Sequence, residues 1–125
     1  MIFLSILAAS AVANCSNYNT TMDINQCLQR EQAAAEVALT ASYKRALASA
    51  AQTDARTDWK RDNRPKTRDA LVQAQRAWIV FRDAHCLSMS FTMRGGSGEG
   101  TAAGACKLAL TEYRIGQLQE IAADY

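Results

Sequence analysis

Few residues of this 125-residue chain could do chemistry. His85 is its single histidine, and no serine or cysteine has a plausible base partner close to it in the sequence. No phosphate-binding loop or metal-ligand motif is present, and the glycines between residues 94 and 104 are too irregular for a dinucleotide-binding turn. We therefore expect no catalytic residue, no metal site and no cofactor. His85 is best explained as a core residue that makes one hydrogen bond.

Four cysteines form the second group with chemical potential: Cys15, Cys27, Cys86 and Cys106. Their separations of 12, 59 and 20 residues contain no C-x-x-C pair and, with one histidine, do not suit a zinc site. In a short exported chain such cysteines predict two disulfides. In a bundle whose three helices run up, down and up, all four would lie at one end, so every pairing stays open. The local pairs Cys15–Cys27 and Cys86–Cys106 are slightly favoured because they close short loops.

Three arginines that fall near apolar positions allow two interpretations. Arg76, Arg82 and Arg114 could line a pocket for an anionic substrate, as in helical mutases. Alternatively they belong to an internal scaffold of ion pairs, because a buried arginine without a partner is costly. Helical counting puts Arg82 and Arg114 in one layer with Glu31 as the nearest carboxylate, and it puts Glu36 level with Arg76. We favour the ion-pair scaffold.

The stretch 70–86 is the element that must position most of these side chains. Apolar residues recur in it at spacings of three and four, which places them on one helical face. The predicted inward residues are Leu71, Ala74, Trp78, Phe81 and His85. A second apolar stripe at every seventh residue suggests that the helix contacts two neighbours. Its polar border, Gln75, Arg76, Arg82 and Asp83, is either a recognition surface or simply the edge of a buried helix.

Two further helices are expected around this central one. A capping-box pattern at Thr20 and Asp23 opens the first, and the polar residues 52–66 connect it to the second. The glycine-rich stretch Arg94–Gly104 predicts a flexible loop before the third. The expected helices span about residues 20–51, 67–92 and 101–123. We predict an all-α fold, a small three-helix up-down-up bundle stapled by two disulfides.

Composition supports one exported domain. The chain is 49% hydrophobic with one proline, and its formal charge of +2 is too small to indicate nucleic acid or an anionic membrane as partner. Residues 1–13 resemble a signal peptide, with a short apolar run and an A-x-A site at residues 11–13, although no basic residue follows Met1. We expect residues 14–125 to form one domain, periplasmic or secreted and without a transmembrane segment. A lipoprotein acylated at Cys15 is the less favoured alternative.

Motifs in three parts of the chain point to a family. They are INQC at 24–27 with Leu39 and Tyr43, AQRAW at 74–78 with Arg82, Asp83 and Cys86, and Cys106 with Thr111, Arg114 and Leu118. Together they resemble the LprI-type lysozyme-inhibitor family of small exported bacterial proteins. Glu36 and Thr40 stand where that family usually has Asp and Asn. The resemblance implies an all-helical exported protein that binds lysozyme.

Three functions follow as hypotheses. The first is a binding protein that inhibits lysozyme or another peptidoglycan-cleaving enzyme by protein contact. For this function the candidate contact residues are Gln75, Arg76, Asp83 and Arg94, and Arg94 could enter the open two-carboxylate cleft of a glycosidase. The second is a small exported enzyme with the arginine-lined anion pocket. The third is a structural envelope protein.

Overall fold

The computed structural model describes residues 11–125, which are helical and contain no strand. Its elements are α1 (Ala11–Cys15), α2 (Thr21–Ala55), α3 (Thr67–Ser90), the 3-10 helix η1 (Phe91–Met93) and α4 (Glu99–Asp124). The all-α prediction is confirmed, with α1 as a short helix that was not expected. Residues 1–10 of the predicted signal peptide lie outside the described residues, and its A-x-A site lies within α1. No helix of residues 11–125 is long and apolar enough to cross a bilayer.

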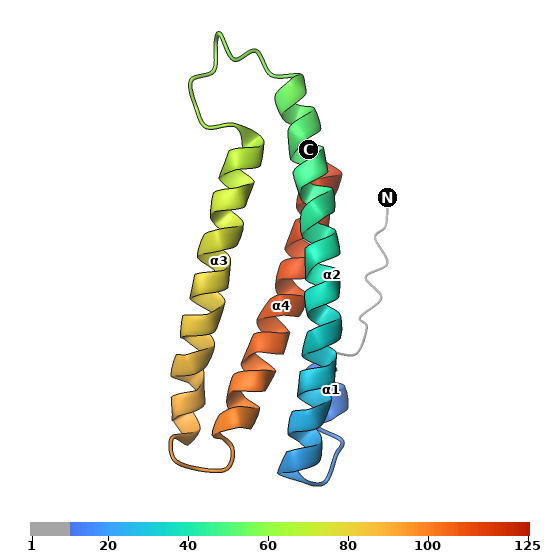
Figure 1. The fold of residues 1–125 in the computed structure, drawn as a ribbon, viewed down its shortest axis with the longest axis vertical. Helices are drawn as coiled ribbons and strands as arrows, with labels where there is room; N and C mark the ends of the chain where they lie inside the picture. Colours follow the sequence, from blue (N-terminus) through green and yellow to red (C-terminus); the bar gives the residue numbers. More distant parts are fainter. Residues whose placement is uncertain (1–10) are drawn as a thin grey trace.

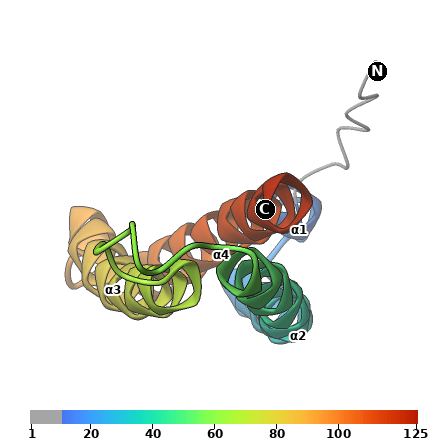
Figure 2. The same cartoon turned by 90° about the horizontal axis from the view of Figure 1, so that it is seen from above.

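Helix α4 is the central helix of the fold. It packs against both α2 and α3, which also contact each other, and Figures 1 and 2 show α3 at the outer edge of the molecule. The short helix α1 lies against α2 and α4. The connection between α2 and α3 spans one end of the molecule, and the turn through η1 closes the opposite end (Figure 1).

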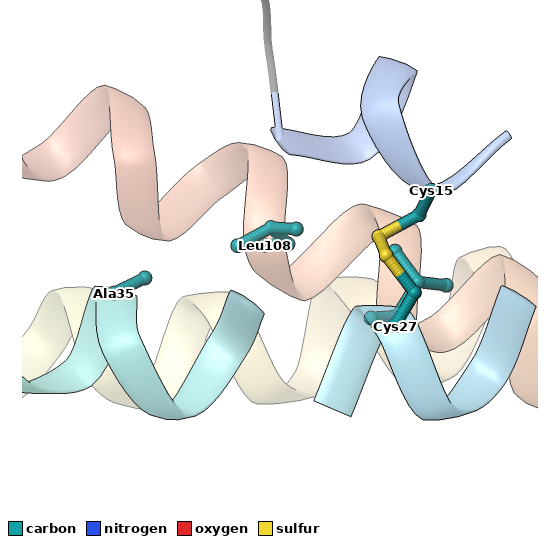
Figure 3. Packing of buried hydrophobic residues seen from close by; sticks show 5 residues of the cluster. Cys15, Cys27, Ala35 and Leu108 are labelled. Carbon is teal, nitrogen blue, oxygen red and sulfur yellow. A yellow bond between two sulfur atoms is a disulfide. The ribbon is translucent and has the colours of Figure 1, made fainter. Parts of the chain in front are cut away.

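Each disulfide joins two cysteines that are consecutive among the four cysteines of the sequence. Cys15 is bonded to Cys27 and Cys86 to Cys106, each with a Cα–Cα distance of 5.5 Å, so the favoured pairing is confirmed. Figure 3 shows the first bridge tying α1 to α2 beside the buried Leu108 of α4. Because the Cys15 sulfur is bonded to Cys27, it offers no thiol for acylation in this structure.

Local polar contacts set the ends of α2 and the start of α3. The Thr20 hydroxyl accepts a hydrogen bond of 3.1 Å from the backbone N–H of Asp23, as the capping pattern predicts. Near the other end, the Asp54 carboxylate accepts from the backbone N–H groups of Thr67 (2.8 Å) and Arg68 (3.0 Å). Lys66, the N-cap of α3, supplies no side-chain bond. Asp54 therefore caps α3 from a different helix.

The core consists of two apolar clusters along the α2–α4 contact. The first, next to the disulfides, contains Cys15, Cys27, Leu28, Ala35 and Leu108. The second, nearer the other end, contains Leu39, Ala46, Ala50, Leu71 and Leu118. Between Leu108 and Leu118 the buried residues of α4 are Thr111 and Arg114. A polar layer of α4 therefore lies between the two clusters, beside Ile115, which packs against both.

The inward face of α3 agrees only in part with the one that apolar spacing predicts. Its buried residues are Leu71, Gln75, Arg82, Cys86 and Ser90, with Trp78 half-buried among them. The predicted inward residue Phe81 is 55% exposed, and Ala74 is also exposed. His85 is half-buried and stacks on Phe81 with ring centroids 5.3 Å apart, rather than lying in the core. The prediction is confirmed for Leu71 and Trp78 and wrong for Ala74 and Phe81, because hydrogen bonds from the other helices allow Gln75 and Arg82 to be buried in their place.

The predicted loop Arg94–Gly104 is also wrong in its length. Helix α4 begins at Glu99, so only residues 94–98 lie outside helices. The backbone N–H of Gly96 donates to the Met93 carbonyl (2.9 Å), and that of Gly95, with φ +79°, donates to the Glu99 carboxylate (3.0 Å). This segment is a hydrogen-bonded turn, where Gly95 supplies the left-handed conformation.

Candidate functional site

The polar layer is built around Arg82, which α3 places between the three long helices. The Arg82 side chain donates from Nη1 to Glu36 Oε1 (2.8 Å) and Thr111 Oγ1 (3.3 Å), and from Nε to Asp83 Oδ1 (3.1 Å). Its guanidinium carbon lies 5.0 Å from the centroid of the Trp78 ring. Although Arg82 is only 6% exposed, a carboxylate from α2 and a hydroxyl from α4 therefore satisfy it.

Gln32 and Thr111 connect the same layer from α2 to α4. Gln32 Nε2 donates to Glu36 Oε1 (2.7 Å) and to Thr111 Oγ1 (3.1 Å). The Thr111 hydroxyl donates in turn to the Lys107 carbonyl (2.7 Å). Glu36 and the fully buried Thr111 thus each accept from both Gln32 and Arg82. Such shared acceptors make the layer a network rather than a set of separate pairs.

Arg114 is the second buried cation of the layer, and amides rather than carboxylates surround it. Its Nε donates to Gln75 Oε1 (2.9 Å) and its Nη1 to Gln117 Oε1 (3.3 Å), while its guanidinium carbon lies 6.0 Å from the Trp78 ring centroid. Arg114 forms no ion pair within residues 11–125. Burial lowers the pKa of its guanidinium, and the electrostatic attraction of Tyr125 offsets this only in part.

The predicted ion-pair layer is right in kind but wrong in its members. Glu36, not Glu31, is the carboxylate that pairs with Arg82, and Glu31 forms no ion pair in the described part of the chain. The predicted pairing of Glu36 with Arg76 is therefore wrong, and Arg76 is exposed. Arg82 and Arg114 do lie in one layer, since their guanidinium carbons lie 5.0 Å and 6.0 Å from the centroid of the same Trp78 ring.

The candidate contact residues divide between interior and surface. Gln75 is 5% exposed and bound to Arg114, so it is not a surface residue. Arg76, Asp83 and Arg94 are exposed. The guanidinium carbon of Arg94 lies 4.3 Å from the centroid of the Phe91 ring, which holds this cation at the end of η1.

Two hollows between the helices are not lined by the arginines of the polar layer. One of about 340 Å³ lies between α2 and α4 and is lined by Asn25, Gln32, Lys107 and their neighbours. Another of about 300 Å³, between α3 and α4, is lined by residues that include Asp83 and Cys86. Neither is lined by Arg82 or Arg114, which are committed to the polar layer. Over residues 11–125 no group of three potential metal ligands comes together.

Apolar side chains also gather on the outer face of α3. Val80, Phe81 and Leu87 are more than half exposed there, and Ala77 and Ala84 lie beside them. A helix in a monomer normally exposes polar residues on this side. The sequence signal for this second face was the apolar side chain of Phe81, which helical spacing wrongly assigned to the core together with Ala74.

Comparison with known proteins then supplies the family. The profile described as "Lysozyme inhibitor LprI" matches residues 12–118. The chain belongs to the LprI lysozyme-inhibitor family. An uncharacterized protein of Rhizobium meliloti (strain 1021) is 32% identical to it, over 93% of this chain and 88% of the relative. No solved structure matches this LprI-family chain.

The LprI-like motifs lie mainly in the interior of this chain. Gln75, Trp78 and Arg82 from the central motif meet Thr111 and Arg114 from the last one in the polar layer. The motif cysteines form the disulfides. The residues by which the family is recognised in this sequence therefore serve mainly as scaffold, and a recognition surface must use their exposed neighbours.

Proposed function

We propose that this protein is an exported inhibitor of a lysozyme and that it acts by protein–protein contact. Membership of the LprI lysozyme-inhibitor family carries this proposal. Two disulfides are typical of an oxidising compartment, which supports a periplasmic or secreted protein whose signal peptide ends at residue 13. In this proposal the three long helices form an up-down-up bundle that presents its turns to the partner.

The turn between η1 and α4 is the part of the surface that we propose enters the lysozyme cleft. Lysozymes hydrolyse glycosides with two carboxyl groups in an open cleft, which a positively charged side chain complements. Arg94 is such a side chain, and it lies exposed against the Phe91 ring. The exposed Met93 next to it adds an apolar contact.

The turn is also organised before any partner binds. Hydrogen bonds within residues 93–99 fix its backbone, and the Cys86–Cys106 disulfide closes its base. A segment that is already ordered loses less conformational entropy on binding, so more of the contact energy contributes to affinity. This order favours the turn over the exposed helix faces as the inhibitory element.

The test is residual muramidase activity of lysozymes of different structural types, measured with increasing amounts of the mature oxidised protein. Arg94→Ala should raise the inhibition constant at least about tenfold, equivalent to about 1.4 kcal/mol of binding. Arg45→Ala, which removes an exposed arginine from α2, is the matched control and should leave inhibition unchanged. If no lysozyme is inhibited, the proposed function is wrong. If Arg94→Ala inhibits like the original protein, the inhibitory surface lies outside the turn.

A further inference from the structure

The outer face of α3 carries an uninterrupted heptad pattern. Ala70, Ala77 and Ala84 recur every seventh residue, and Gln73, Val80 and Leu87 follow each of them by three. All six are exposed, and Val80 is 70% exposed. They lie on the side of the helix opposite the buried residue Arg82. This spacing is the one by which two helices pack side by side as a coiled coil.

Nothing else in the described chain covers this face. Figure 2 shows α3 at the edge of the molecule, with α2 and α4 both on its other side. The inward contacts of α3 use a different set of residues, which includes Leu71, Gln75 and Cys86. Helix α3 therefore has one side that the fold uses and one heptad side left for a second helix.

We propose that the second helix is α3 of another copy of this chain, packed antiparallel to the first. Charge selects this occupant and this direction. Arg76 and Asp83 are seven residues apart on one edge of the heptad face. When Ala77 of one copy lies opposite Val80 of the other, Arg76 of each copy lies within a turn of Asp83 of the other. The two-fold axis makes this complementary pair twice.

The registers one heptad away lack this match. Sliding the helices by one heptad brings Arg76 next to its own equivalent, or Asp83 next to its own, which are repulsive contacts. In a parallel pair the neighbour of Arg76 is Phe81 of the second copy, which offers no opposite charge. On the second edge of the antiparallel pair, the 55% exposed Phe81 lies against the small Ala74 of the second copy.

The two charged groups are free to make these contacts. Arg76 forms no ion pair within residues 11–125. Asp83 uses Oδ1 to accept from Arg82 and keeps Oδ2 for a second donor, and its side chain is 57% exposed. The paired stretch, residues 70–87, does not include Arg94. This inference therefore stands independently of the proposed inhibition.

The test is sedimentation of the mature oxidised protein from about 1 µM to about 1 mM, a range that covers weak helix pairing. The protein should sediment as a concentration-dependent dimer. Val80→Glu should weaken the dimer at least tenfold. Val37→Glu is the matched control, because Val37 is 73% exposed on α2, and it should leave the dimer intact.

The charges test the direction of packing. Arg76→Glu and Asp83→Lys should each weaken self-association, while an equimolar mixture of the two variants should form a heterodimer because every charge again meets its opposite. Circular dichroism of each variant checks that its helices remain folded. A monomer at every concentration would overturn the proposal, as would a dimer that Val80→Glu or Arg76→Glu leaves unchanged. If Val80→Glu abolishes lysozyme inhibition in a protein that is always monomeric, the face binds lysozyme instead, and the dimer is wrong.

Discussion

Glu36→Ala is the most informative perturbation of the scaffold, because within residues 11–125 it removes the one carboxylate from another helix that pairs with the buried Arg82. Breaking a fully buried ion pair costs about 3–5 kcal/mol, and an exposed pair contributes about 0–1 kcal/mol. The Arg82 side chain is 7% exposed and that of Glu36 41%, so this pair lies between the two cases. Water can reach part of the space that the carboxylate leaves, and Arg82 keeps Thr111 and Asp83 as acceptors.

We therefore expect Glu36→Ala to lower the free energy of unfolding by about 2 kcal/mol. For a domain of this size the melting temperature should fall by about 8 °C. Glu36→Gln should cost about 1 kcal/mol, since its amide oxygen still accepts a hydrogen bond from Arg82 but carries no charge. Urea unfolding of the oxidised protein, followed by circular dichroism, measures each difference.

Glu31→Ala is the matched control, with the same substitution on the same helix. Glu31 forms no ion pair in the described residues, so its loss should change stability by less than about 0.5 kcal/mol. Equal losses for Glu31→Ala and Glu36→Ala would refute the assignment of Arg82's partner. No loss for Glu36→Ala would show that Thr111, Asp83 and Trp78 alone stabilise the buried cation.

Two further predictions concern the covalent and capping contacts. Thiol titration of the unfolded, unreduced protein should detect no thiol, and two reactive thiols per chain would contradict the pairing. Replacing either disulfide, Cys15–Cys27 or Cys86–Cys106, by two alanines should lower the free energy of unfolding by about 3 kcal/mol. Partial burial raises the pKa of Asp54, but the hydrogen bonds from the backbone N–H groups at the start of α3 outweigh this effect and lower the pKa below its ordinary value of 3.8. The cap therefore stabilises the fold above pH 3.8, and this stabilisation is lost as the pH falls through the folded-state pKa. Asp54→Asn should accordingly lower the melting temperature more at pH 7 than at pH 2, and an equal difference at both would contradict the cap.

The sequence by itself determined the features that depend on neighbours along the chain. The Thr20–Asp23 pattern marked the start of α2 because an N-cap involves residues three apart. The cysteine separations favoured the observed bridges because short loops close at the lowest entropic cost. The helical class followed from apolar spacing and the scarcity of glycine and proline. The family resemblance was likewise visible in the motifs, and the family match confirms it.

Only the tertiary structure decided which side of α3 faces inward. Several stripes of that helix have apolar residues at helical spacing, so periodicity could not choose between them. The buried stripe contains Gln75 and Arg82, whose burial is favourable only because Arg114, Glu36 and Thr111 supply hydrogen-bonding partners. Those partners come from other helices, at sequence separations of 29 to 46 residues. No pattern within α3 contains that information.

The tertiary structure also decided which glutamate meets Arg82. Counting from the cysteines assumed that all three long helices start level. The Cys86–Cys106 disulfide does fix α3 against α4, but Cys27 is bonded to Cys15 in α1, so no covalent link fixes the height of α2. Packing of α2 against α4 sets that height, and it brings Glu36 rather than Glu31 to Arg82. A shift of five residues along a helix is about 7.5 Å, which is enough to exchange one ion-pair partner for another.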